Sequence, residues 1–206
     1  MSLLNLLFEE EFSEDSEDFK AVVADASKDV EEKDKPAVKA MLKDVFTSNK
    51  KIGDILGISE AREARLYVDA CKMYESGQYP QAESLFTLLY GFRPSSDKYL
   101  FALAASIHRQ ERYDEAMMYY FMYPSVKPED PKGYYHAADC LRNLNRNEAA
   151  FESLGTALLY THGRPEYEKL GDTIQEEMAA LEAIIEKENS SKTSKKVNKK
   201  DSNKTD

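Results

Sequence analysis

Apolar residues recur along this chain at helical spacing, and the helical stretches themselves repeat at a long interval. Ala82, Ala116 and Ala150 lie 34 residues apart in successive units. A small residue stands twelve positions before each of them, and a large one stands four positions after. The small residues are Ala70, Ala104 and Ala138, and the large ones are Phe86, Tyr120 and Leu154. This pattern predicts a pair of helices that repeats three times.

Helix-breaking residues close each unit, namely Pro94, Pro128 and the stretch 162–165. Two antiparallel helices approach closely only where small side chains let the backbones near each other, so the alanines are expected at the crossings. A 34-residue repeat with this pattern is the tetratricopeptide signature. Because one repeat cannot bury its own apolar face, the sequence predicts an all-α superhelical solenoid of three stacked repeats, at 63–96, 97–130 and 131–164.

The repeats depart from the usual pattern in two places. Large apolar residues, Leu66, Leu100 and Tyr134, stand where a tryptophan is usual. Gly77 occupies the turn between the helices of the first repeat, where a left-handed conformation suits glycine. Glu111 and Asn145 occupy the equivalent turns of the other two repeats.

Helices are also predicted on both sides of the repeats. After Pro165, apolar residues step by three or four, which predicts a capping helix at 165–188. They are Tyr167, Leu170, Ile174, Met178, Leu181 and Ile185. Before the repeats, residues 36–62 are predicted to form a helix that begins at Pro36, followed by a turn. Ser59 is then expected to cap the first helix of the first repeat.

The helix that Pro36 opens has an apolar face larger than one end of a small solenoid obviously covers. Its predicted contact residues are Met41, Leu42, Val45 and Phe46. Exposed patches of this kind usually meet partners, so we expect a weak homodimer through this face.

The two ends of the chain have compositions typical of disorder. Residues 1–35 are rich in acids and residues 189–206 in Lys, Ser and Asn, so both are expected to be mostly disordered. Leu3, Leu4, Leu7 and Phe8 share a helical face near the N-terminus. Two interpretations stay open for them: docking on a partner or second subunit, or a disordered apolar patch.

Charge and composition exclude several classes of protein. The formal charge of −10 argues against direct nucleic-acid binding, which needs a net basic face. No apolar stretch approaches the roughly 20 residues of a membrane-spanning helix, and the first residues lack the basic start of a secretory signal. Cys71 and Cys140 are too few for a disulfide framework, so a reducing cytosol is expected, with buried structural roles for both thiols.

No catalytic or cofactor motif stands out. His108, His136 and His162 have no metal-site spacing, and the glycines form no phosphate cradle. The carboxylates show no paired acid and base arrangement. The chain is therefore predicted not to be an enzyme and to use no cofactor or metal.

The first helix of each repeat lines the concave side of a tetratricopeptide stack, where an extended peptide with spaced apolar anchors can bind. An aromatic residue recurs there in every repeat, flanked by small and polar residues. The predicted client-binding residues are Tyr67, Cys71, Tyr74, Phe101, Ala105, His108, Arg109, Tyr135, Asp139 and Arg142.

Two alternatives bear on this groove. The aromatics at Tyr67, Phe101 and Tyr135 could be ordinary core residues, although other large residues already fill the core positions. A carboxylate clamp for an acidic C-terminus is disfavoured, because Tyr67 and Cys71 stand where its Lys and Asn would be and only Lys132 could match.

The stretch Tyr134-Tyr135-His136-Ala137-Ala138-Asp139-Cys140-Leu141 closely resembles the FHAAECL stretch of a known family. These are the class II, or translocator, chaperones of bacterial type III secretion systems. The segments 74–79 and 113–116 resemble their first two repeat turns, and the likeness runs from about 45 to 185.

This resemblance implies a protein of the bacterial cytoplasm that keeps hydrophobic, pore-forming translocator proteins soluble and secretion-competent. Family members bind a short N-terminal client segment in the concave groove and often dimerise through their N-terminal helices. Secretion-apparatus or regulatory proteins are further partners that it implies. Two other classes stay open: a generic tetratricopeptide interaction scaffold, and a regulatory subunit of an enzyme.

Overall fold

The computed structural model describes residues 17–47 and 52–201, with side chains omitted for 18, 45–47 and 191–201. These described ranges are helical and contain no strand. The elements are α2 (Glu17–Ala26), α3 (Lys35–Thr47), α4 (Ile52–Ile55), α5 (Glu60–Glu75), α6 (Tyr79–Phe92), α7 (Asp97–His108), α8 (Tyr113–Val126), α9 (Lys132–Asn143), α10 (Asn147–Thr161), η1 (Pro165–Tyr167) and α11 (Glu168–Asp201).

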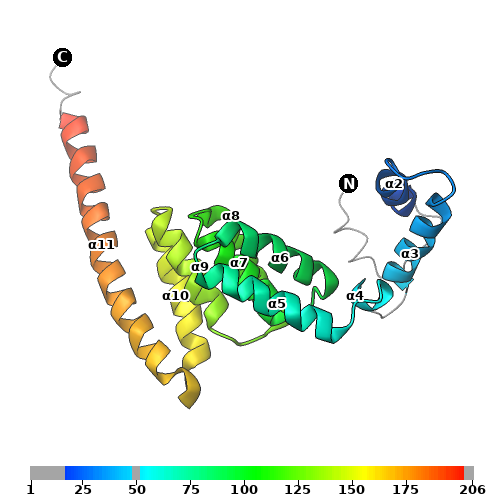
Figure 1. Ribbon diagram of the computed structural model, residues 1–206. Helices are drawn as coiled ribbons and strands as arrows, with labels where there is room; N and C mark the ends of the chain where they lie inside the picture. Colours follow the sequence, from blue (N-terminus) through cyan, green and yellow to red (C-terminus); the bar gives the residue numbers. More distant parts are fainter. Residues whose placement is uncertain (1–16, 48–51, 202–206) are drawn as a thin grey trace.

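The pairs α5/α6, α7/α8 and α9/α10 stack side by side, with α11 along one end and α4 and α3 leading away from the other (Figure 1). The predicted all-α tetratricopeptide solenoid is therefore confirmed. Ser59 caps α5 as expected, since its side chain accepts a hydrogen bond from the backbone N–H of Arg62 at 3.3 Å.

Small residues occupy the helix crossings of every repeat. All six crossing alanines have an exposed fraction of 0%. They are Ala70, Ala82, Ala104, Ala116, Ala138 and Ala150. The large residues four positions later fill the layer between repeats, where Phe86, Tyr120 and Leu154 are at most 2% exposed. The 34-residue pattern therefore reflects packing: the helix backbones approach closely at the alanines, and the large side chains fill the space between repeats.

Each repeat turns between its helices through a left-handed residue. Gly77 has φ +79°, and Glu111 and Asn145 hold the equivalent places at φ +62° and +56°. Glycine adopts this region without steric cost and asparagine tolerates it, whereas glutamate is strained there. The second repeat therefore keeps the turn geometry despite an unsuitable side chain.

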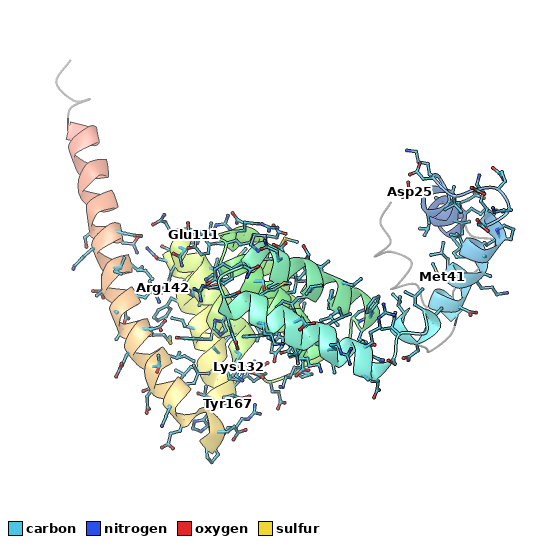
Figure 2. All side chains as sticks on the ribbon, in the orientation of Figure 1. Asp25, Met41, Glu111, Lys132, Arg142 and Tyr167 are labelled. Atoms are coloured by element: carbon cyan, nitrogen blue, oxygen red, sulfur yellow. The ribbon has the colours of Figure 1, made fainter. Side chains whose placement is uncertain are left out.

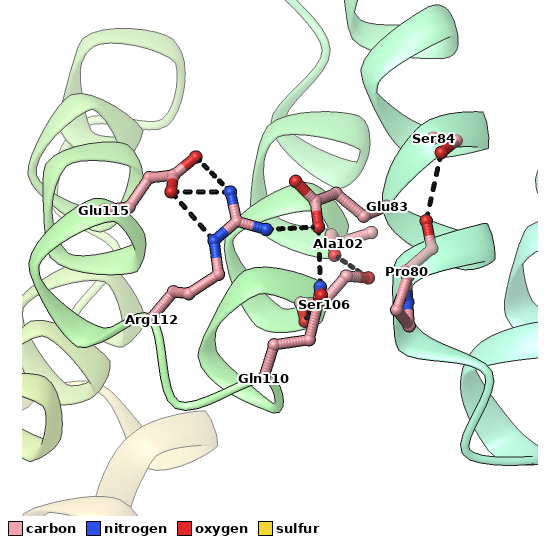
Figure 3. A network of polar contacts seen from close by, with 8 residues as sticks. All are labelled: Pro80, Glu83, Ser84, Ala102, Ser106, Gln110, Arg112 and Glu115. Carbon is pink, nitrogen blue, oxygen red and sulfur yellow. Dashed lines mark hydrogen bonds and ion pairs between the residues drawn. The ribbon is translucent and has the colours of Figure 1, made fainter.

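A polar network beside the strained turn ties the second repeat to the first (Figure 3). Glu83 on α6 accepts hydrogen bonds from Gln110 Nε2 at 2.6 Å and from Arg112 Nη1 at 2.7 Å. Arg112 also pairs with Glu115 on α8 at 2.6 Å. These bonds fix the α7–α8 turn against the preceding helix pair.

A buried ion pair fastens α4 to the first repeat. Arg93 donates to Glu63 Oε2 at 2.5 Å and to Asp54 Oδ1 at 3.0 Å. Glu63 is 2% exposed, and a Cβ on Gly53 would lie 2.9 Å from its other carboxylate oxygen. A side chain at 53 would therefore have to displace this carboxylate and press on Phe92, whose Cβ would lie 3.3 Å away.

The helix α11 closes the other end of the stack. Ile174 and Leu181 are buried against α10, and Asn147 donates to Glu188 Oε1 at 2.8 Å. The predicted capping helix is present, but α11 continues to Asp201, through residues expected to be disordered. Extending a formed helix needs no new nucleus, and lysine has a high helix propensity.

The acidic N-terminal region also differs from its expectation. Residues 17–26 form α2, whose Phe19 is 0% exposed and supplies an apolar contact that the acid-rich composition concealed. Residues 1–16, with the predicted face of Leu3, Leu4, Leu7 and Phe8, lie outside the described residues, as do 48–51 and 202–206.

The predicted dimerisation face is described only in part. Met41 is 38% exposed and Leu42 is half-buried, while the side chains of Val45 and Phe46 lie outside the described residues. The dimer through α3 stays a prediction.

Candidate functional site

The ten predicted client-binding residues lie on α5, α7 and α9, and we call the surface that they form the first-helix face. None of them is fully buried. Eight are half-buried, and Arg109 and Arg142 are exposed. Figure 2 shows Arg142 at the edge of the stack that faces α11.

At the α5 end of this face, a lysine side chain lies over two aromatic rings. The ring of Tyr67 lies 5.8 Å from that of Phe86 and 5.6 Å from that of Tyr99. Lys98 Nζ stands 5.1 Å above Tyr67 and 4.8 Å above Tyr99. Burial, with the neighbouring Cys71, raises the pKa of Tyr67 to about 12, so this phenol is neutral.

The middle of the face is a cluster of stacked and edge-on rings. Phe101 lies 5.6 Å from Tyr120, 5.3 Å from Tyr123 and 5.2 Å from His136. His136 stacks on Tyr120 at 5.3 Å and 21°. Burial lowers the pKa of His136 to about 4, so its imidazole is neutral near pH 7 and packs as a flat, weakly polar ring.

A histidine joins all three helices around this cluster. His108 on α7 places Nε2 3.2 Å from Asp139 Oδ2 on α9 and Nδ1 3.5 Å from the hydroxyl of Tyr120 on α8. The contact with His108 lowers the pKa of Asp139. The ionised Asp139 is therefore held in place at the surface of the face.

At the α9 end, the face meets α11. The hydroxyl of Tyr135 donates to Glu177 Oε1 at 2.9 Å, and Arg142 Nη1 donates to Glu177 Oε2 at 2.9 Å. Burial raises the pKa of Tyr135 to about 12. Arg142, predicted to bond to a client, is thus already paired with a carboxylate of the same chain.

Glu177 is a residue that sequence reasoning missed. It lies among many glutamates of α11, and no spacing distinguishes it from those on the solvent side. Only the rotation of α11 against α9 brings it to the face.

The predicted aromatics behave neither as closed core nor as free surface. Tyr67, Phe101 and Tyr135 each pack on core residues while keeping part of the side chain accessible. Client binding by these residues stays a prediction, and their loss is expected to affect stability as well as binding.

A second apolar surface lies on the other side of the stack, on α6, α8 and α10, and was not predicted. Its exposed apolar residues are Leu88, Met118, Phe121, Met122 and Leu159. A cleft of about 410 Å³ opens between α8 and α10, with Phe121 and Tyr134 in its wall. The sequence feature that could have indicated this surface is the high methionine content of α8, because methionine is frequent on adaptable binding surfaces.

The described residues hold no group of three or more His, Cys, Asp or Glu side chains placed to bind a metal ion. None of the helices in the described ranges is both long and apolar enough to cross a membrane. Cys71 and Cys140 are free thiols, and burial raises the pKa of Cys140 to about 12.

Comparisons with known proteins give one consistent picture. The family model for the tetratricopeptide repeat matches residues 98–123. The low calcium response locus protein H of Yersinia pseudotuberculosis is 25% identical over 131 residues, which are 64% of this chain and 78% of that protein.

Two solved structures of the type III secretion translocator chaperone SycD from Yersinia enterocolitica share the fold. One is 24% identical with a TM-score of 0.61, covering 65% of this chain and 99% of that chain. The other, in complex with a peptide of the translocator YopD, is 25% identical with a TM-score of 0.58, covering 61% and 96%. The resemblance to translocator chaperones is confirmed.

Proposed function

We propose that this chain is a chaperone of a bacterial type III secretion system, which binds hydrophobic translocator proteins and keeps them soluble and competent for secretion. The observation that carries the proposal is the fold that this chain shares with a translocator chaperone solved in complex with a peptide of its translocator. The match covers 96% of that chaperone.

The first-helix face supplies suitable chemistry for a client segment. Half-buried rings at Tyr67, Phe101 and Tyr135, one in each repeat, offer apolar contacts at regular intervals. An extended segment with spaced apolar side chains would bury each anchor against one ring. Such central anchors typically contribute about 2 kcal/mol or more each, whereas rim charges contribute little.

Charge supports the same role. The chain has a formal charge of −10, and a strongly charged partner opposes aggregation of an apolar client. In this proposal the activity is binding without catalysis, and it takes place in the bacterial cytoplasm before export.

The test is to isolate the full chain from its native cell under mild conditions and identify the proteins bound to it. We expect a protein with long hydrophobic segments, retained by the unaltered chain and lost from Tyr67→Ser/Phe101→Ser. The matched control is Leu159→Ser, at a 72% exposed position of α10 away from the first-helix face.

Each of the other classes predicts a different result. A catalytic protein that co-purifies in fixed ratio would indicate a regulatory subunit. Several soluble partners, equally retained by the Tyr67→Ser/Phe101→Ser variant, would indicate a scaffold. Either result would contradict the chaperone proposal.

A further inference from the structure

Two cations on the first-helix side of the stack have aromatic neighbours but no carboxylate partner among the described residues. Lys98 Nζ lies over the rings of Tyr67 and Tyr99. The guanidinium of Arg109 lies 4.7 Å from the ring centre of Tyr79 and 5.9 Å from that of Tyr74. Both side chains are exposed, as is Arg142, but of these three cations only Arg142 pairs with a described carboxylate, that of Glu177. This end of the face therefore combines accessible rings with unsatisfied positive charge.

The chain itself contains a segment with the complementary chemistry. Residues 3–8 are apolar except for Asn5, and three glutamates follow at 9–11. Apolar side chains next to carboxylates match rings next to cations.

We propose that residues 3–11 bind the first-helix face of their own chain. In this arrangement Leu and Phe side chains of residues 3–8 contact the rings of Tyr67 and Phe101, and the carboxylates of 9–11 lie near Lys98 and Arg109. The segment thereby competes with the client, a consequence that rests on the proposed function, whereas the binding of the segment does not.

Because the segment is covalently attached to the chain, a weak contact is sufficient to occupy the first-helix face for much of the time. Residues 12–16 separate the segment from α2, and a short tether that spans its two binding sites gives an effective concentration on the order of millimolar. A segment with millimolar affinity is then bound for about half of the time, and the apparent affinity for a client falls by the fraction of faces that it occupies. The exposed ion pairs between the glutamates of the segment and the two cations add a small contribution to the binding free energy, which salt screens.

Cys71 provides a direct reporter of this contact in the full chain. It lies half-buried on the first-helix face, whereas Cys140 is 0% exposed and reports whether the core stays closed. The rate of alkylation by iodoacetamide is measured separately for the two thiols by mass spectrometry of their peptides. The variant is Leu3→Ser/Leu4→Ser/Leu7→Ser/Phe8→Ser, and the matched control is Leu88→Ser on the exposed side of α6.

We expect Cys71 to react about two- to threefold faster in the quadruple variant than in the unaltered chain, because a half-occupied face protects it for half of the time. The Leu88→Ser variant and the Cys140 rate should show no change. Replacing residues 9–11 by glutamine should give an intermediate Cys71 rate with less dependence on salt.

Equal Cys71 rates in the quadruple variant and the unaltered chain would overturn the proposal. Protection that disappears on dilution would also overturn it, since a tethered segment is insensitive to protein concentration and a segment from a second copy is not. If Cys71 is protected but the quadruple variant retains no more client than the unaltered chain, the proposed competition between the segment and the client is wrong. If the unaltered chain binds no translocator while Cys71 is still protected by the segment, the proposed function fails and the segment contact stands.

Discussion

Truncating Tyr67 to alanine should reduce both client affinity and stability, and the ratio of the two losses identifies the role of this ring. Tyr67 is half-buried, in contact with the rings of Phe86 and Tyr99 and with Lys98 above it. Removing a fully buried aromatic typically costs about 3–5 kcal/mol, so a half-buried one should cost about 2 kcal/mol. For a chain of this size that is a fall of about 4–8 °C in Tm.

Client affinity should fall by about 30-fold, which corresponds to the ~2 kcal/mol of a central interface anchor. The matched variant is Phe86→Ala, at a position only 2% exposed, which should lose about 3–5 kcal/mol of stability while its folded fraction binds normally. Urea denaturation gives the stability of each variant, and titration with the translocator that co-purifies from the native cell gives its affinity.

The reasoning would be refuted if Tyr67→Ala lost as much stability as Phe86→Ala and the folded remainder bound the client at full affinity. Tyr67 would then belong to the core, and the same conclusion would extend to Phe101 and Tyr135.

Replacing Glu111 by glycine, which the first repeat has at the equivalent turn, should raise the unfolding free energy in urea by about 1 kcal/mol, because it relieves a left-handed strain; lower stability would contradict the strain. Because burial lowers the pKa of His136 to about 4, below an unfolded value of about 6.5, its contribution to stability is complete above pH ~6.5 and declines as pH falls toward the folded value. His136→Phe should flatten the pH dependence of unfolding across that interval, and an unaltered profile would show that another group causes it. Leu42→Glu/Phe46→Glu should shift sedimentation toward monomer with helical content intact; loss of helix would mean that this face is core.

Much of the fold could be predicted because its determinants are local and periodic. The alanine positions follow from a 34-residue spacing, and Ser59 and Pro36 mark helix starts through short-range chemistry. The turn at Glu111 was located by its alignment with Gly77 even though its own side chain disfavours the conformation.

The contacts that were not predicted join residues far apart in sequence. Arg93 meets Glu63 and Asp54 across 30 and 39 positions, and Glu177 meets Tyr135 across 42. Such pairs depend on how whole helices rotate against each other, and composition offers many equivalent glutamates and arginines. The extent of α2 and α11 was missed because composition measures average burial and overlooks one well-placed apolar residue such as Phe19.

The helix α11 sets the length of the first-helix face. It packs against α10 and reaches α9 through Glu177, the place where a further repeat would otherwise add its first helix. A solenoid without such a terminator can lengthen by duplication, and its binding surface lengthens with it. The first-helix face ends at Arg142, which pairs with Glu177, and under the proposed function this end limits the length of client segment that the face holds. A client whose apolar anchors span more than three repeats gains nothing from the excess, and selection on clients would act on the order and spacing of a few anchors.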